Sequence, residues 1–311
     1  MKRLVECVPN FSEGRDLGVV DAIVAAMRAV PGAFVLHRES DPDHNRSVVT
    51  LAGEPEAVAE AVVRAVEKAA ELIDLTRHAG AHPRTGAADV VPFVPLEGAT
   101  MEDCVALARE TGRVIWERHH IPVYFYEAAA QRPERAPLEN IRRWQFEELR
   151  EAAPRDPARA PDIGGPGLHP TAGAVTLGAR KFLIACNFNL DTPDVRVAQR
   201  IAKTIRASNG GLPSVKAMGV ELRTRHVAQV SVNLTDFEQT PLPRLVEAVR
   251  REAEACAVAI AATELVGLIP RRAMQAAEGF DLGINNFSPA RVLENCLETA
   301  AGGAVVGDAR R

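Results

Sequence analysis

The residues with the clearest capacity for chemistry lie in one stretch, residues 77–96, between a long helical pattern and an apolar run of strand length. The loop inside this stretch holds His78, His82, Arg84 and Asp89. A neutral imidazole can accept a proton and return it near neutral pH. A proline follows His82 and biases the backbone before it toward an extended form, so His82 is the best acid–base candidate. The alternative is a plain connector with solvated histidines.

His78 and His82 stand at the spacing of two metal ligands on one face of a helix. Gly80 and Pro83 disfavour a helix there, so the spacing loses its geometric basis. The sequence holds no C-x-x-C pair either, and we expect no functional metal. A metal-dependent amidohydrolase that uses His44 together with the two loop histidines is the alternative.

A second unusual segment, residues 162–173 (DIGGPGLHPTAG), is rich in glycine and poor in charge. Such a loop can present backbone donors to a ligand, and close backbone packing is the alternative. Within this segment His169-Pro170-x-x-Gly173-Ala174 repeats the pattern His82-Pro83-x-x-Gly86-Ala87. The repeat favours two similar halves of the chain that face one cleft, with chance as the other explanation.

Hydrophobic periodicity predicts alternating strands and helices in the first half of the chain. Strands are expected at residues 4–8, 33–36, 47–51, 90–96 and 123–126, and helices at 16–28, 54–75, 100–119 and 138–151. The second half predicts a strand at 181–189, a helix from 192, a hairpin of 215–222 with 228–234, a helix at 240–256 and a strand at 263–268. This order of strand, helix, two strands, helix and strand is ferredoxin-like.

The composition is that of a globular protein, with 311 residues of which 47% are apolar and 25% charged, enough for one large or two smaller domains. A net charge of −4 and 5% aromatic residues give no sign of a nucleic-acid partner. No apolar run reaches the length of a membrane span or a signal peptide. Five scattered cysteines argue against a disulfide framework, so we expect a reduced, cytoplasmic location.

Several longer motifs occur in a fixed order along the chain. They are ECVPNFSEG at 6–14, NRSV at 45–48, RHAGAHPRTGAADVVPF at 77–93, GARKFLIA at 178–185 and LVGLIP at 265–270. In sequence and in order they resemble glutamate formiminotransferase, the family that forms the N-terminal half of formimidoyltransferase-cyclodeaminase. This combination is far more specific than any single motif above.

The resemblance implies a mixed α/β fold of two ferredoxin-like subdomains, residues 1–178 and 179–311, whose sheets face each other across a folate-binding cleft, in a homodimer. It implies transfer of the formimino group from N-formimino-L-glutamate to N5 of tetrahydrofolate, which gives 5-formiminotetrahydrofolate and glutamate. Tetrahydrofolate would act as co-substrate without a metal. A separate cyclodeaminase would act on the product.

The resemblance also implies particular site residues. The catalytic histidine of the family lies in its His-Pro-Arg motif, which corresponds to His82, and we expect this histidine to titrate near neutrality. This chain departs from the animal form at His169 and Ala172, where the animal form carries an apolar and a large aromatic residue. The folate-binding loop of the family corresponds to Gly164, Gly165, Pro166, Gly167, Leu168, His169, Pro170, Thr171, Ala172 and Gly173.

Both expected substrates are anionic, and arginine suits bidentate pairing with carboxylates. We expect Asp89, or a carboxylate of the 41–43 loop, to orient the imidazole of His82. A related donor such as formiminoglycine or formylglutamate, or a non-catalytic ligand-binding protein, is the alternative. The residues expected to contact the substrates are Asn10, Asp41, His44, Arg46, Arg84, Asp89, Arg180 and Lys181.

Overall fold

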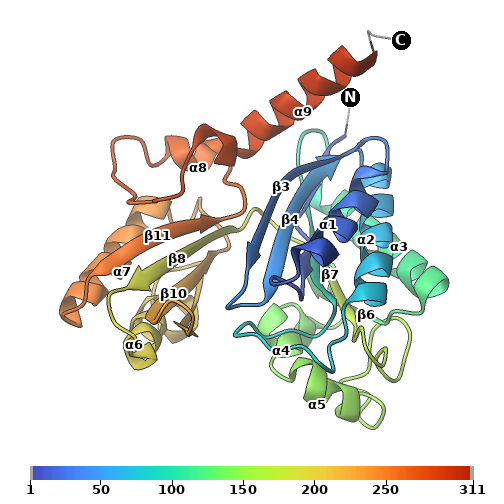
Figure 1. The fold of residues 1–311 in the computed structure, drawn as a ribbon, viewed down its shortest axis with the longest axis horizontal. Helices are drawn as coiled ribbons and strands as arrows, with labels where there is room; N and C mark the ends of the chain where they lie inside the picture. The colour runs from blue at the N-terminus through green and yellow to red at the C-terminus, as the bar shows by residue number, and fades with distance from the viewer. Residues whose placement is uncertain (1–2, 309–311) are drawn as a thin grey trace. The chain divides into compact units, whose positions relative to one another are not determined.

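The computed structural model describes residues 3–308, and its chain divides into two compact units, residues 1–180 and 181–311 (Figure 1). The division falls after Arg180, whereas the sequence predicted it after residue 178. The outermost residues of both predicted subdomains, 1–2 and 309–311, lie outside the described part. Each unit has its own sheet and its own hydrophobic core.

The first unit is built on one sheet. Its order across the sheet is β3, β4, then β1 and β2, then β5, β7 and β6. Because β1 and β2 each pair with both β4 and β5, they act as two parts of one interrupted strand. The strands are β1 (Val5–Cys7), β2 (Asn10–Phe11), β3 (Ala33–Asp41), β4 (Arg46–Gly53), β5 (Ala88–Pro95), β6 (Val123–Glu127) and β7 (Val175–Ala179).

The ferredoxin-like order holds in the first unit and is extended by two strands. The strands β1/β2, β3, β4 and β5, with helices α1 (Leu17–Arg28) and α2 (Pro55–Leu72), form the ferredoxin-like part. Helix α3 (Met101–His119) leads to β6, and β5, β7 and β6 run parallel. Strand β3 is longer than predicted, because it pairs with β4 as far as Asp41 opposite Arg46.

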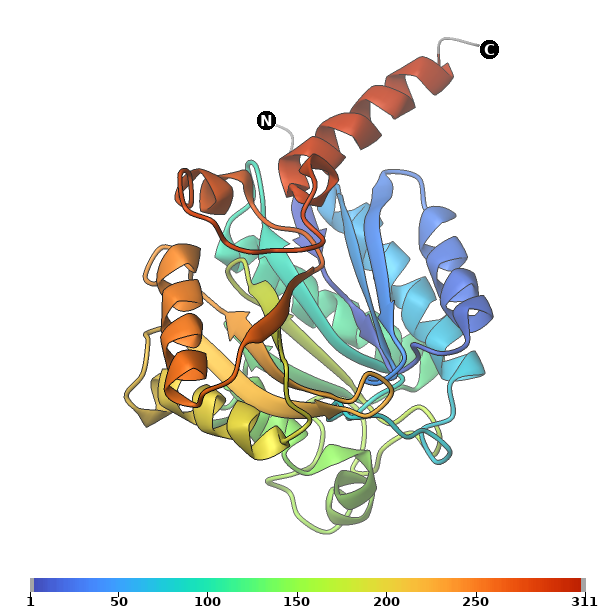
Figure 2. The ribbon, with the colours of Figure 1, turned by 60° about the vertical axis from the view of Figure 1, so that its left-hand side comes forward.

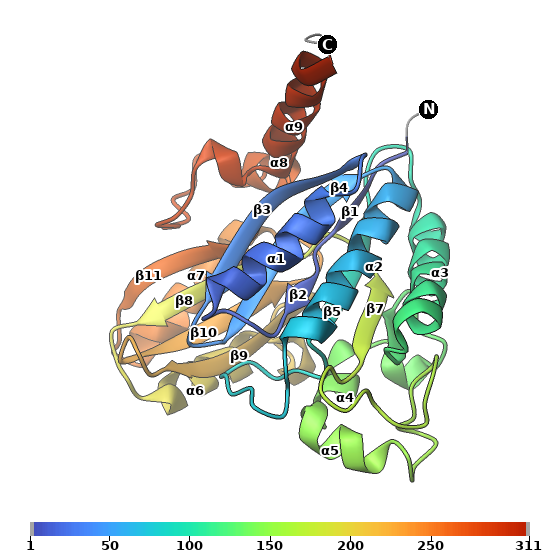
Figure 3. The same ribbon diagram turned by 45° about the vertical axis from the view of Figure 1, so that its right-hand side comes forward.

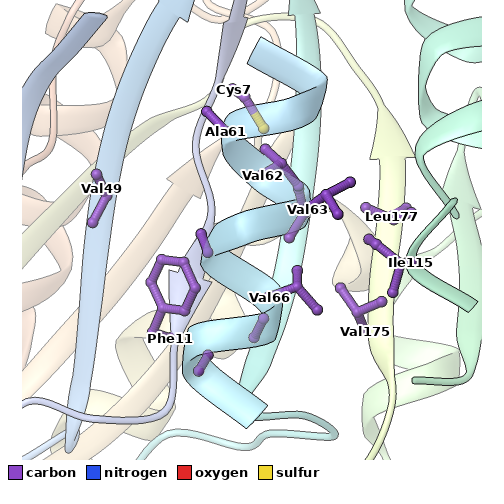
Figure 4. Packing of buried hydrophobic residues seen from close by; sticks show 14 of the residues in the cluster. Cys7, Phe11, Val49, Ala61, Val62, Val63, Val66, Ile115, Val175 and Leu177 are labelled. Carbon is purple, nitrogen blue, oxygen red and sulfur yellow. The ribbon is translucent and has the colours of Figure 1, made fainter. Parts of the chain in front are cut away.

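Helices α1, α2 and α3 lie side by side on one face of this sheet (Figure 3). The apolar stripe of α2, which is Val58, Val62, Val66 and Ala69, is buried. In Figure 4 the valines of this helix lie between Phe11 of β2 and Leu177 of β7. Burying one valine side chain contributes about 1.5–3 kcal/mol, so this stripe fixes α2 against the sheet. The loop that follows α2 therefore begins at a fixed position relative to the sheet.

Two short helices pack on the opposite face of the sheet and replace the single helix predicted over 138–151. Ile141 of α4 (Leu138–Arg142) and Leu149 of α5 (Gln145–Ala152) contact Tyr124 and Tyr126 of β6. The helix breaks because Gln145 has a left-handed φ of 47°, which an α-helix does not accommodate. The break lets both helices contribute a side chain to the same site.

The second unit has the predicted ferredoxin-like order, and its four antiparallel strands follow the order β11, β8, β10, β9. Helices α6 and α7 cover one face of the sheet (Figure 2). A Cβ at Gly219 of β9 would lie 2.3 Å from the Gln199 nitrogen, so glycine allows α6 to approach. The elements are β8 (Ile184–Leu190), α6 (Val195–Ile205), β9 (Val215–Leu222), β10 (Val227–Leu234), α7 (Leu242–Ala255), β11 (Ile260–Val266), α8 (Arg271–Gln275) and α9 (Leu293–Asp308).

No helix in the described part of the chain combines the length and the apolar character that a membrane crossing requires.

Candidate active site

Two loops of the first unit, residues 42–45 and 73–87, pack directly on each other and carry the predicted site residues His44, His82 and Arg84. A Cβ at Gly80 would lie 2.4 Å from the His44 carbonyl oxygen, and the Ala81 nitrogen donates to the Asp43 carbonyl at 3.1 Å. The contact leaves a cavity of about 10 Å³, roughly the space of one water molecule. Its lining residues are Phe11, Ser12, His44, Asn45, Arg46, His78, His82, Arg84 and Asp89.

His82 lines this cavity and has the tautomer of a base. Its Nδ1 lies 2.8 Å from the Pro83 carbonyl oxygen, which can only accept, so Nδ1 carries the hydrogen and Nε2 keeps its lone pair. Nε2 makes no hydrogen bond within residues 3–308. Burial, followed by the charges of Arg46 and Arg142, holds the pKa of His82 well below 6.5. The imidazole is therefore neutral at neutral pH, with a pKa below the near-neutral value expected from the sequence.

His78 is fully engaged by its neighbours. Nδ1 accepts a hydrogen bond from Arg84 Nε at 2.9 Å, which leaves Nε2 to donate to the Asn45 carbonyl at 3.0 Å. Burial also lowers the pKa of His78. With both nitrogens in use, this ring can act neither as a base nor as a metal ligand, which argues against the amidohydrolase alternative. Among the described residues no group of three or more His, Cys, Asp or Glu is placed to hold a metal.

Arg84 is also held inside the protein. Its Nη1 and Nη2 donate to the two carboxylate oxygens of Glu147 at 2.8 and 2.6 Å, and Nη2 reaches the His78 carbonyl at 3.2 Å. This bidentate pair with Arg84 is the main cause of the lowered pKa of Glu147. Since every nitrogen of the guanidinium has a partner, Arg84 positions the loop, and the arrangement does not favour the substrate contact predicted for it.

Asp89 lies under the cavity and is almost fully buried. Oδ1 accepts from the Thr85 nitrogen at 2.8 Å and from the Thr85 hydroxyl at 3.0 Å, and Oδ2 accepts from Arg142 Nη2. Asp41 accepts from the His44 nitrogen at 2.8 Å. The prediction that a carboxylate orients His82 is wrong for Nδ1, because the neighbouring carbonyl of Pro83 already satisfies that atom.

Arg46 and Asn10 come from neighbouring strands and meet at the edge of the cavity. Asn10 Oδ1 accepts a hydrogen bond from Arg46, while Asn10 Nδ2 donates to the Val8 carbonyl at 2.7 Å. Burial and the charge of Arg142 lower the pKa of Arg46 to about 9. Arg46 Nε is buried and has no partner among the described residues. A guanidinium so placed is suited to an incoming anion.

The glycine-rich segment runs beside the loop that carries His82. Gly86 and Gly173 form an antiparallel bridge, with Ala87 donating to Ala172 at 2.9 Å and Ala174 donating to Thr85 at 3.1 Å. A Cβ at Gly173 would lie 2.1 Å from the Thr85 carbonyl oxygen, so glycine is required there. The two copies of the repeated motif thus pair with each other inside the first unit, and the prediction that they mark two facing halves is wrong.

Comparisons with known proteins agree with this arrangement. A family model described as the N-terminal subdomain of the formiminotransferase domain matches residues 4–180, and a model described as the formiminotransferase domain matches residues 185–288. The chain belongs to the formiminotransferase family. The matched residues cover nearly all of the first structural unit and most of the second.

Relatives of this formiminotransferase chain include single-function and fused proteins. The glutamate formimidoyltransferase of Streptococcus pyogenes serotype M1 is 42% identical over 96% of this chain and 99% of its own length. That of Thermoplasma acidophilum is 44% identical over 96% of this chain and 98% of its own length. The mouse formimidoyltransferase-cyclodeaminase is 42% identical over 90% of this chain and 52% of its own length.

In this formiminotransferase, four predicted substrate-binding residues are not among the residues that line the cavity, namely Asn10, Asp41, Arg180 and Lys181. Arg180 follows β7, and its backbone nitrogen donates to the Phe93 carbonyl at 3.0 Å while its guanidinium contacts the Tyr126 hydroxyl. Lys181 begins the second unit and pairs with Asp236 at 2.8 Å. The residues that sequence reasoning missed are Arg142 and Glu147, which lie on the two short helices.

Proposed function

We propose that this protein is a glutamate formimidoyltransferase that moves the formimino group from N-formimino-L-glutamate to N5 of tetrahydrofolate, its co-substrate. The proposal is supported by two relatives that carry this name at 42% and 44% identity over almost their whole lengths. The observation that carries it is the neutral His82, whose Nε2 keeps its lone pair in a cationic cavity. A general base that acts on an anionic donor needs a free lone pair and positive charge around it.

The chemistry follows from that single base. N5 of tetrahydrofolate attacks the amidine carbon and forms a C–N bond, which gives a tetrahedral intermediate. His82 Nε2 accepts the proton that N5 must lose. The resulting imidazolium gives this proton to the leaving nitrogen as its bond to carbon breaks, and glutamate departs with its amine restored. Burial and the charges of Arg46 and Arg142 lower the pKa of His82, so its imidazolium gives up the proton more readily, which favours this second step.

The decisive experiment for the proposed function is turnover of N-formimino-L-glutamate with tetrahydrofolate, measured against formiminoglycine and formylglutamate as donors. We expect N-formimino-L-glutamate to have the highest kcat/KM. A higher kcat/KM for either rival donor would move the assignment to that donor. Binding of folate without any turnover would favour a non-catalytic protein. We also propose that no metal takes part, and activity that survives chelation and dialysis would agree with this.

We propose that the segment from Gly164 to Gly173 binds the folate, and Gly167 offers the sharpest test. Gly165 has φ +111°, so any side chain there strains the backbone, whereas Gly167 has no positive φ and its Cβ would lie 3.7 Å from Pro154. Gly167→Leu should weaken tetrahydrofolate binding about tenfold or more, the loss of one good contact. Calorimetric titration checks this.

The control for Gly167→Leu is Ala158→Leu, which places the same leucine side chain at an exposed position outside the segment. Both variants should keep the melting temperature of the parent within a few degrees. Equal folate affinities in the two variants would contradict a folate site in this loop.

The lowered pKa values of His82, His78 and His169 predict a pH dependence of stability. Their folded pKa values lie below 6.5, so between 6.5 and those values the unfolded chain binds more protons than the folded one. Stability should therefore fall as pH drops below 6.5. Thermal unfolding from pH 7.5 to 5 measures this, and His82→Ala should flatten the slope. A melting temperature that rises toward pH 5 would contradict the prediction.

The remaining partners follow from the same proposal. We propose a cytoplasmic homodimer whose product is consumed by a cyclodeaminase. The free cysteines Cys7, Cys104 and Cys186, all buried, are compatible with a reducing compartment. Light scattering of the purified protein tests the dimer.

A further inference from the structure

Two buried guanidinium nitrogens, Nε of Arg46 and Nε of Arg142, have no hydrogen-bond partner among the residues that the structure describes. A buried charged donor without a partner is costly, and folded proteins rarely keep one without a functional reason. Both groups belong to the cavity of His82, since Arg46 lines it and Arg142 binds Asp89, which also lines it.

The hydrogen bonds of the two arginines leave part of each guanidinium without an acceptor, although Asp89 and Asp41 offset some of the charge of Arg46. Arg142 donates to Asp89 through Nη2 alone, and Asp89 is also occupied by Thr85. Arg46 has a neutral amide, Asn10, as its hydrogen-bond acceptor within residues 3–308. The two positive charges are close enough that Arg142 lowers the pKa of Arg46. A carboxylate between them would supply acceptors for both Nε–H groups and offset their repulsion.

We propose that Arg46 and Arg142 together bind the α-carboxylate of the formimino donor, an inference that rests on the proposed function. In the proposed mechanism His82 donates a proton to the leaving nitrogen, which is the α-amino nitrogen of glutamate. The α-carboxylate is attached to the same carbon as that nitrogen, whereas the γ-carboxylate lies further along the side chain. Groups beside His82 are therefore placed for the α-carboxylate.

The test compares three donors that differ in their carboxylates. N-formimino-L-glutamate has both, N-formiminoglycine keeps the α-carboxylate, and N-formimino-4-aminobutyrate keeps the γ-carboxylate alone. Arg46→Gln removes one charge from a group that makes no ion pair within the described residues. Arg142→Gln combined with Asp89→Asn removes both charges of the buried pair together and leaves an oxygen for Thr85. Arg143→Gln, on the exposed neighbour that stacks on Trp144, is the matched control.

Both test variants should raise KM for the two donors with an α-carboxylate by about 10- to 100-fold, the effect of one charged hydrogen-bonding partner. They should change kcat less, because the contact is made in both ground and transition states. KM for N-formimino-4-aminobutyrate should change by less than about threefold. Arg143→Gln should match the parent with every donor. Equal KM increases for all three donors, or none, would overturn the proposal.

Calorimetric binding of L-glutamate, glycine and 4-aminobutyrate separates this inference from the proposed function. If the parent lacks turnover with every donor, the proposed function fails. Glutamate and glycine binding that both test variants lose would then still support the carboxylate site. A parent that binds neither amino acid, or variants that bind both as the parent does, would overturn the site itself.

Discussion

Replacing His82 with alanine is expected to lower turnover by about 10²–10⁴-fold, the usual contribution of one acid–base group. The variant should stay folded, because the one hydrogen bond of His82 is to the carbonyl of the next residue and ties no other element to the loop. It should still bind folate, since the segment proposed for that lies elsewhere in the sequence. Steady-state kinetics, circular dichroism and folate titration on one preparation check the three parts.

His78→Ala is the matched control for this prediction. His78 accepts from Arg84 and donates to Asn45, so its loss should reduce stability by about 1–3 kcal/mol through the buried Arg84 donor left without a partner. Its effect on turnover should be much smaller than that of the His82 change. The roles given to the two histidines are wrong if His78→Ala is the crippling change and His82→Ala the mild one.

Asp89→Ala is expected to lower the free energy of unfolding by about 3–5 kcal/mol, the cost of breaking one partner out of a buried ion pair. The side chains of Arg142 and Asp89 are only 13% and 3% exposed, so little water could replace the lost carboxylate. The change also removes the acceptor of both Thr85 donors. Urea denaturation followed by circular dichroism measures the effect.

Asp21→Ala is the control for Asp89→Ala. Asp21 pairs with Arg38 on the surface, where its side chain is 64% exposed, and such pairs contribute about 0–1 kcal/mol. If the two changes lower the free energy of unfolding equally, the contacts of Asp89 do not stabilise the site as we expect.

Much of the fold could be predicted because it is encoded locally. The stripe of Val58, Val62 and Val66 repeats at helical spacing, and it lies buried on α2 in the structure. The alternation in residues 228–234 likewise predicted the half-buried strand β10. The ferredoxin-like order followed from these local signals. The break between α4 and α5 did not, because the left-handed backbone of Gln145 leaves no mark in hydrophobic periodicity.

Only the site residues on the loop around His82 could be predicted from the sequence. His82 could be singled out from the neighbouring proline, and the structure agrees that it has an available nitrogen. Arg142 and Glu147 could not, because they reach Asp89 and Arg84 across 53 and 63 residues from a segment in which the sequence predicts a helix and no site residue. The repeated His-Pro motif misled for a similar reason. Its two glycines reflect one close backbone pairing between the copies, which sequence similarity alone cannot distinguish from an internal duplication.

The central claim is that His82 Nε2 moves the proton in the formimino transfer itself. Steady-state rates can report product release, so the most direct measurement is the single-turnover rate of 5-formiminotetrahydrofolate formation with both substrates bound. The account predicts that His82→Ala slows this step by about 10²–10⁴-fold. A single-turnover rate in His82→Ala within a few-fold of the parent would contradict it.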